Sequence, residues 1–82
     1  MKLANGQDAP PELVKLLTPG NKVRVNFGGN NPNNAIYHIL AIVDGDQVVC
    51  KSWGKNKQRW FYKVEDAYLF WLYYKDGNLT EA

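Results

Sequence analysis

The sequence predicts a mostly β domain of five short strands that follows a short N-terminal helix. Residues 22–27 alternate between apolar and polar side chains, which is the pattern of a half-buried strand. An Asp44-Gly45 pair lies between two further runs of strand length and is a strong signal for a β-hairpin. Residues 28–34 are all turn formers, so they predict a long flexible loop between the first strand and that hairpin.

The length of 82 residues indicates one domain, which we place at residues 10–75, after a flexible N-terminus at residues 1–9 and before a C-terminal tail at residues 76–82. The single cysteine, Cys50, excludes an intrachain disulfide, and one Cys with one His does not supply a zinc site, so we expect no metal or other cofactor. The lone thiol and the lack of an apolar run near the N-terminus predict a cytoplasmic protein. The longest apolar run, residues 67–74, is too short to span a bilayer, so we expect no membrane partner.

The N-terminal helix is predicted at residues 12–17, where apolar side chains recur at helical spacing. Pro10 and Pro11 precede this run, and proline is favoured in the first turn of a helix. The helix is expected to end before Pro19, which disfavours helical backbone in the residue that precedes it, and Gly20 opens a turn.

The predicted hairpin joins residues 35–43 to residues 47–53. If Asp44-Gly45 forms a two-residue turn, the pairing of the two strands follows directly. A three-residue turn that includes Asp46 would shift one strand relative to the other, which is the alternative. The two-residue turn predicts inward pairs Val43–Asp46, Ala41–Val48, Ile39–Cys50 and Tyr37–Ser52, and more polar, outward pairs Ile42–Gln47, Leu40–Val49, His38–Lys51 and Ile36–Trp53.

The alternation at residues 59–64 predicts a fourth strand. The run at residues 67–74 is apolar throughout, so periodicity does not separate a buried strand from a short helix there. Its aromatic richness favours a fifth strand after a helical turn at residues 65–68. A helix across the whole run, closed by Lys75 and Gly77, is the alternative. Both faces of the run need cover, which we expect from the N-terminal helix, with a second copy of the protein as the alternative.

This order of elements resembles a small SH3-like barrel, a family that includes SH3, Tudor and KOW-type modules and many small bacterial and phage proteins. The first strand is entered through Pro-Gly-Asn-Lys-Val-Arg-Val at residues 19–25, which is similar to the entry of KOW-like barrels. The segment Tyr-Lys-Val-Glu-Asp at residues 62–66 resembles the turn before their last strand. The resemblance covers residues 19–75 and implies a small five-stranded barrel. It includes neither the acidic loop nor the Pro-pocket aromatic pair of signalling SH3 domains, so it implies no functional residues.

The segment at residues 51–63 is strongly basic and rich in aromatic residues. It reads KSWGKNKQRWFYK, with five cations, four aromatic residues and no acid, whereas the whole chain has a net charge of +2. Cations contact phosphates and flat rings stack on bases, so this pattern is typical of surfaces that bind nucleic acid. We therefore predict phosphate contacts by the cations and stacking by the tryptophans of this segment, namely Lys51, Trp53, Lys55, Lys57, Arg59, Trp60 and Lys63. The alternative is that the lysines solubilise a hairpin turn and protect an exposed strand edge, while the aromatic residues belong to the core.

Four other features are weaker candidates for function. Lys22 and Arg24 project from the polar face of the first strand and would extend the basic surface if the fold brings that face beside the basic segment, although solvation alone also explains them. The asparagines of residues 28–34 could bind bases, but turn geometry explains them. Cys50 and His38 could form a thiolate–imidazole pair, but the two-residue turn places them on opposite faces of the hairpin. The paired carboxylates of the chain lie at turns and strand ends without a pocket, so the sequence predicts no enzyme.

The function predicted from the sequence is therefore a non-enzymatic module that binds nucleic acid with weak sequence selectivity, because lysines on a turn contact phosphates and do not read bases. The alternative is a small protein-interaction or inhibitor module, which would dock a partner or a second copy through exposed aromatics such as Trp53. An accessory protein of a phage or mobile element fits that description. The two hypotheses differ in their response to salt, because phosphate binding weakens steeply with ionic strength and aromatic docking does not.

Overall fold

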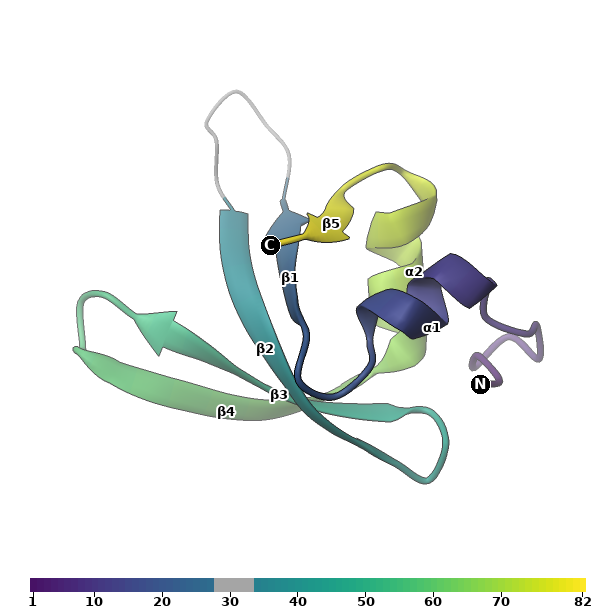
Figure 1. Ribbon diagram of the computed structural model, residues 1–82, viewed down its shortest axis with the longest axis horizontal. Coiled ribbons are helices and arrows are strands. Elements are labelled where there is room, and N and C mark those ends of the chain that lie inside the picture. Colours follow the sequence, from purple (N-terminus) through teal and green to yellow (C-terminus); the bar gives the residue numbers. More distant parts are fainter. Residues whose placement is uncertain (28–33) are drawn as a thin grey trace.

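The computed structural model describes residues 1–27 and 34–82, so the loop expected at residues 28–34 lies outside this part except for its last residue, Asn34. Five antiparallel strands form one open sheet, and two short helices accompany it (Figure 1). The prediction of a mostly β fold is confirmed. The elements in chain order are α1 (Pro11–Leu16), β1 (Lys22–Asn26), β2 (Asn34–Val43), β3 (Gln47–Gly54), β4 (Arg59–Asp66), α2 (Ala67–Lys75) and β5 (Leu79–Glu81).

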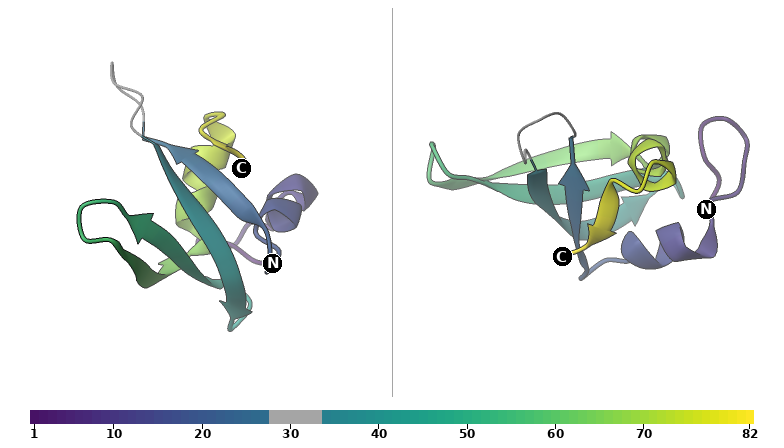
Figure 2. Two further views of the ribbon diagram at one scale, coloured as in Figure 1. Left: turned by 60° about the vertical axis from the view of Figure 1, so that its left-hand side comes forward. Right: turned by 90° about the horizontal axis from the view of Figure 1, so that it is seen from above.

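The strand order across the sheet is β4-β3-β2-β1-β5. The long strand β2 lies in the middle and belongs to both halves of the sheet, the β1 half and the β3–β4 half. The first part of β2 pairs with β1, from Asn34 to His38, and its second part pairs with β3, from His38 to Val43. His38 is therefore the residue at which both pairings meet. Beyond this point the β3–β4 hairpin extends away from the β1–β2 half, as Figures 1 and 2 show.

Both helices pack on the same face of the sheet and enclose the core with it (Figure 2). The strands contribute small β-branched and aliphatic side chains, as their alternation requires. Strand β2 also contributes Tyr37, whose aromatic ring packs edge to face on that of Phe70 in α2, with 6.2 Å between ring centroids. The buried core consists of Leu3, Leu13, Leu17, Val23, Val25, Tyr37, Ile39, Val48, Cys50, Ala67, Phe70 and Leu79.

The prediction of a fifth strand within residues 67–74 is wrong. The alternative, a helix across the whole run, is confirmed, because residues Ala67–Lys75 form α2. The helix begins because the side chain of Asp66 accepts a hydrogen bond from the backbone N–H of Tyr68 at 2.9 Å, which is an N-cap. Ala67 and Phe70 are buried in the core, and the other residues of the run are half-buried. The hydroxyl of Tyr74 donates to Glu12 of α1 at 2.8 Å, so the N-terminal helix contacts this run as expected.

The fifth strand lies instead in the segment that was expected to be a C-terminal tail. Residues Leu79–Glu81 pair with β1, and Leu79 is buried beside Val25. The backbone N–H of Ala82 also donates to the carbonyl of Lys22 at 3.0 Å, which extends the pairing by one residue. A strand this short has too few residues to show an alternating pattern, so the sequence carries no signal for it.

The turn of the β2–β3 hairpin has three residues, so the two-residue turn favoured from the sequence is wrong. Asp44 and Gly45 have φ values of 56° and 78°, the left-handed backbone that an Asp-Gly pair tolerates. Val43 consequently pairs with Gln47. A β-bulge between Ile39 and Ala41 then shifts the register back by one residue. The predicted pairs Ile39–Cys50 and His38–Lys51 are therefore correct, while the predicted pairs nearer to the turn are displaced.

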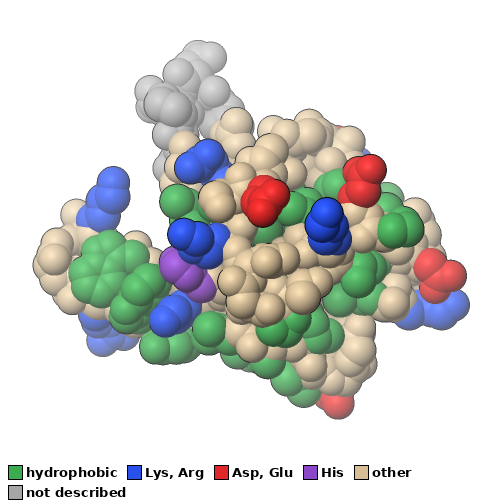
Figure 3. Space-filling model, viewed as in Figure 1, with side chains coloured by type: hydrophobic (Ala, Val, Ile, Leu, Met, Phe, Trp, Pro, Cys, Tyr) green, Lys and Arg blue, Asp and Glu red, His purple; other side chains and the backbone are tan. Residues whose placement is uncertain are grey.

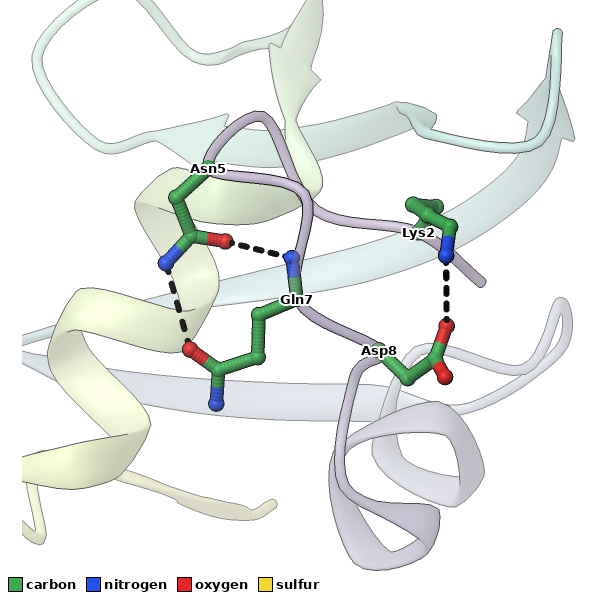
Figure 4. A network of polar contacts seen from close by, with 4 residues as sticks. All are labelled: Lys2, Asn5, Gln7 and Asp8. Atoms are coloured by element: carbon green, nitrogen blue, oxygen red, sulfur yellow. Dashed lines mark hydrogen bonds and ion pairs between the residues drawn. The ribbon is translucent and has the colours of Figure 1, made fainter.

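The first nine residues, which were expected to be flexible, form a closed turn against the core. Leu3 is buried, and the backbone N–H of Ala9 donates to the carbonyl of Met1 at 2.9 Å. The polar side chains of this turn contact one another, as Figure 4 shows: Asn5 with Gln7, and Lys2 with Asp8 in an ion pair of 3.6 Å. Apart from residues 28–33, the chain has no helix that is long and apolar enough to cross a membrane.

Candidate functional site

The sheet has an outer face that neither helix covers, and Lys51, Trp53 and Trp60 of the predicted site lie on it. Residues that pair across antiparallel strands share a face. Ile39 and Cys50 point into the core, so the neighbouring pair His38–Lys51 points outward. The same alternation assigns the following residues to this outer face: Lys22, Arg24, Ile36, His38, Val49, Lys51, Trp53, Trp60, Tyr62 and Val64.

An aromatic cluster occupies the centre of the outer face. Trp53 and Trp60 are cross-strand partners, and their rings meet edge to face with centroids 5.3 Å apart. The ring of Trp60 also contacts that of His38 at 5.0 Å, and the ammonium of Lys51 lies 4.3 Å from the centroid of Trp60. Trp53 is 46% exposed, so one tryptophan of the cluster keeps a large free surface while its partner is held on three sides.

A cleft opens beside this cluster, between the first part of β2 and the end of the β3–β4 hairpin. It has a volume of about 660 Å³. In Figure 3 the same region appears as a hollow between the projecting hairpin and the rest of the molecule, with Lys and Arg side chains on both sides. Cations, a histidine and an exposed indole line this cleft. The lining residues are Lys22, Asn34, Ala35, Ile36, His38, Ser52, Trp53 and Lys55.

The positive charge of this face is not neutralised by carboxylates. The ion pairs found within residues 1–27 and 34–82 are Lys2–Asp8, Lys63–Glu65 and Lys75–Asp76, and none of them includes a cation of the outer face or the cleft. Burial lowers the pKa of the His38 imidazole, and the positive charges of Lys51 and Lys22 lower this pKa further. Excess positive charge around a concave surface attracts anionic ligands.

The residues predicted from the basic segment divide into three groups. Lys51, Trp53 and Trp60 lie together on the outer face. Lys55 and Lys57 lie in the exposed turn between β3 and β4, and Lys55 reaches the cleft. The strand alternation sends the remaining two, Arg59 and Lys63, to the opposite face of the sheet.

Lys63 contacts core residues rather than the candidate site. Its ammonium donates a hydrogen bond to the hydroxyl of Tyr37 at 3.0 Å, lies 4.4 Å from the centroid of the Tyr37 ring, and pairs with Glu65 at 3.3 Å. Burial acts to lower the pKa of Lys63, but the interactions with Tyr37 and Glu65 raise it by more, so the net shift is upward. We therefore regard Lys63 as a structural residue.

The structure also brings other residues to the site. The polar face of β1 lies beside the basic segment, as required for Lys22 and Arg24 to extend the basic surface, because β1 pairs with β2 and β2 pairs with β3. Lys22, His38 and Lys51 form one row across these three strands. Ile36 and His38 join the cleft. The predicted hairpin register already placed His38 opposite Lys51, so the position of His38 at the site could be inferred from the sequence. The pairing between β1 and β2 could not be predicted from the sequence.

The structure offers no catalytic arrangement for Cys50. The thiol is fully buried, burial raises its pKa, and it lies on the opposite face from His38. A buried thiol with a raised pKa is a poor nucleophile. No group of three or more His, Cys, Asp or Glu residues that could hold a metal ion occurs in the described ranges. Asn34 is the one asparagine of the predicted loop within those ranges, and it lines the cleft.

Comparisons of the chain with protein-family models, with curated proteins and with solved structures found no match.

Proposed function

We propose that this protein is a non-enzymatic module that binds nucleic acid through its outer face and cleft, with weak sequence selectivity. The observation that carries the proposal is a cleft that holds Lys22, Lys55 and the exposed indole of Trp53, with no carboxylate among its lining residues, beside the outer-face cations Arg24 and Lys51, which form no ion pair with any described residue. Phosphates would meet Lys22, Arg24, Lys51 and Lys55, and a base would stack on Trp53. Selectivity would be weak, because these contacts address the backbone and the π-face of any base.

The shape of the cleft favours a single strand over a duplex. An indole offers a stacking platform only to a base whose face is free, and bases within a duplex are already stacked on one another. Trp53 lies on the wall of a concave site rather than on a convex surface that could follow a groove. We therefore propose single-stranded DNA or RNA as the ligand.

A titration of tryptophan fluorescence with short oligonucleotides tests this function. For single strands the logarithm of the binding constant falls with the logarithm of salt by roughly 0.7 per phosphate contact, so four cations predict a slope of about −2.8. Between 50 and 200 mM salt the affinity would fall roughly fifty-fold. The variant Lys22→Gln/Lys55→Gln should halve the slope to about −1.4. Lys15→Gln/Lys75→Gln removes the same charge from exposed lysines of α1 and α2; it is the matched control and should leave the slope unchanged.

Two results would refute the proposal. One is the absence of any fluorescence response at 50 mM salt. The other is a slope that Lys22→Gln/Lys55→Gln and Lys15→Gln/Lys75→Gln change equally, because a diffuse charge effect does not distinguish these positions. Trp53→Ala should in addition weaken binding by about 1–3 kcal/mol, the typical value of one stacked base.

A second candidate function is a protein-interaction module, favoured by the exposed apolar side chains around the cleft. Ile36 is 38% exposed and Trp53 is 46% exposed, and together they could hold an apolar anchor of a partner. Binding of this kind changes little between 50 and 200 mM salt, so the same titration separates the two functions.

The SH3-like identity of the fold is likewise a proposal. The chain order of the strands, the helical segment before the last strand and the pairing of that strand with β1 support it. The open sheet is a departure from a closed barrel.

A further inference from the structure

Strand β4 forms an open edge of the sheet. It pairs with β3 along all eight of its residues, and within the described part of the chain no other strand pairs with it. An edge strand of this length carries a row of backbone N–H and C=O groups that can pair with another strand.

The middle of this edge carries exposed apolar side chains. Tyr62 is 66% exposed and Val64 is 60% exposed, which are the largest values among the large hydrophobic residues that the structure describes. Proteins usually guard such edges with outward lysines or with proline. The chain has no proline in β4, and Lys63 turns inward to Tyr37 and Glu65. The exposed cation of this strand, Arg59, is its first residue, so the exposed apolar part of the edge lacks an outward lysine and could be covered by another strand.

We propose that this edge is covered by β4 of a second copy of the protein, in an antiparallel pair centred on Tyr62. A two-fold axis normal to the sheet keeps the outer face of both copies on one side, and it pairs residues whose numbers have the same parity. Centred on Tyr62, the axis pairs Arg59 with the partner's Glu65 and Trp60 with the partner's Val64. Opposite charges meet on the helix-bearing face and apolar side chains meet on the outer face.

Neighbouring registers are less favourable. An axis through Phe61 places Arg59 opposite the partner's Lys63, and an axis through Lys63 places the two Lys63 ammonium groups opposite each other. Like charges that face each other across strands are destabilising. An axis through Val64 would extend the pairing into α2, which begins at Ala67. No neighbouring register gives a longer overlap within β4, and the register centred on Tyr62 is the one that also brings opposite charges together.

A cysteine placed on the proposed axis tests both the interface and its register. In this register Tyr62 faces itself, and opposed residues in antiparallel strands have Cα atoms about 4.5–5.5 Å apart, within the range of a disulfide. Tyr62→Cys should give a disulfide-linked dimer on mild oxidation of the folded protein. Val64→Cys is the matched control, because the two Val64 positions would lie roughly 13 Å apart along the strands. The native Cys50 is fully buried, and the unmodified protein in the same oxidant measures any contribution from it.

The charge pairs give a second test, by sedimentation equilibrium of the unoxidised protein. Arg59→Glu and Glu65→Arg should each weaken dimerisation roughly tenfold or more, because the two-fold axis repeats each like-charge contact. The combination Arg59→Glu/Glu65→Arg should restore dimerisation. A monomeric wild-type protein at high micromolar concentration would overturn the proposal. So would crosslinking that is as fast at Val64→Cys as at Tyr62→Cys. Neither outcome depends on whether the protein binds nucleic acid.

Discussion

The pairing of Lys63 with Tyr37 gives a quantitative test of how the basic segment divides between binding and stability. A hydrogen bond from a charged donor contributes about 1.5–3 kcal/mol in a buried site. The Lys63 side chain is 40% exposed, so solvent screening reduces this to about 1 kcal/mol. Tyr37→Phe removes the hydroxyl but keeps the ring, so it isolates the hydrogen bond from the cation–π contact. We expect Tyr37→Phe and Lys63→Met to show a coupling energy of about 1 kcal/mol in a double-mutant cycle.

Urea denaturation of the four proteins in this cycle measures the coupling. Lys63→Met alone should lower the free energy of unfolding by about 1.5–2 kcal/mol, because it also removes the cation–π contact and the ion pair with Glu65. Each kcal/mol lowers Tm by about 4–8 °C in a domain of this size. A coupling energy below about 0.3 kcal/mol would refute the structural role of Lys63, since additivity within that margin indicates independent sites. Oligonucleotide affinity should be unchanged in Lys63→Met and reduced in Lys51→Met; the reverse order would return Lys63 to the binding site.

Three further predictions concern local features. Asp66→Ala should cost about 1 kcal/mol of unfolding free energy through loss of the N-cap bond to Tyr68, whereas Asp66→Asn should retain most of it; equal losses in urea melts would contradict the capping role. The pKa of His38 is lowered in the folded state, so its contribution to stability is complete above the unfolded pKa of about 6.5 and is lost as pH falls below it; His38→Gln should flatten this part of the pH–stability curve, and an unaltered curve would argue against the shift. A Cβ at Gly54 would collide with the ring of Phe61, so Gly54→Ala should destabilise the hairpin by about 1–3 kcal/mol, and by less in a Phe61→Leu background, as urea melts of the single and double variants would show.

The sequence predicted elements wherever a local pattern was tied to a single structure. Strand β1 follows from strict alternation, and the inward position of Val23 and Val25 follows with it. The helix at residues 67–75 was ambiguous because an unbroken apolar run has no period, and the decisive contact is the cap at Asp66 rather than the composition of the run. Strand β5 depends on pairing with a segment more than fifty residues away, and nothing in its own three residues indicates that partner.

The hairpin shows how two local departures can leave a prediction partly correct. The three-residue turn moves the register by one residue, and the bulge after Ile39 moves it back. Both the longer turn and the bulge lie in the chain between Ile39 and Cys50, so their effects on the register cancel before His38 and Lys51. The predicted outward position of these two residues is therefore correct. A bulge of this kind depends on the bend of β2 between its two partners, which is a tertiary property that the sequence of one strand does not report.

For the candidate site, sequence reasoning found the segment but not its division between faces. Alternation within β4 implied that Trp60 and Lys63 could not share a face, yet charge composition alone grouped them. The contribution of Lys22 required knowledge that β1 lies beside β2, which only the assembled sheet provides.

The shared strand β2 has a consequence for the internal stability of the molecule. Pairing between β2 and β3 ends at His38 and Lys51, so the remainder of the β3–β4 hairpin is a ribbon of two strands without a third among the described residues. Such ribbons are marginally stable in water. The backbone amides of Trp53 and its neighbours should therefore exchange with solvent through local openings, far faster than those of Val23 or Ile39. Trp53 and Lys55 belong to this easily opened part of the fold. A ligand that bridges them to Lys22 across the cleft should stabilise the hairpin, and the earliest sign of its binding would be slower amide exchange there.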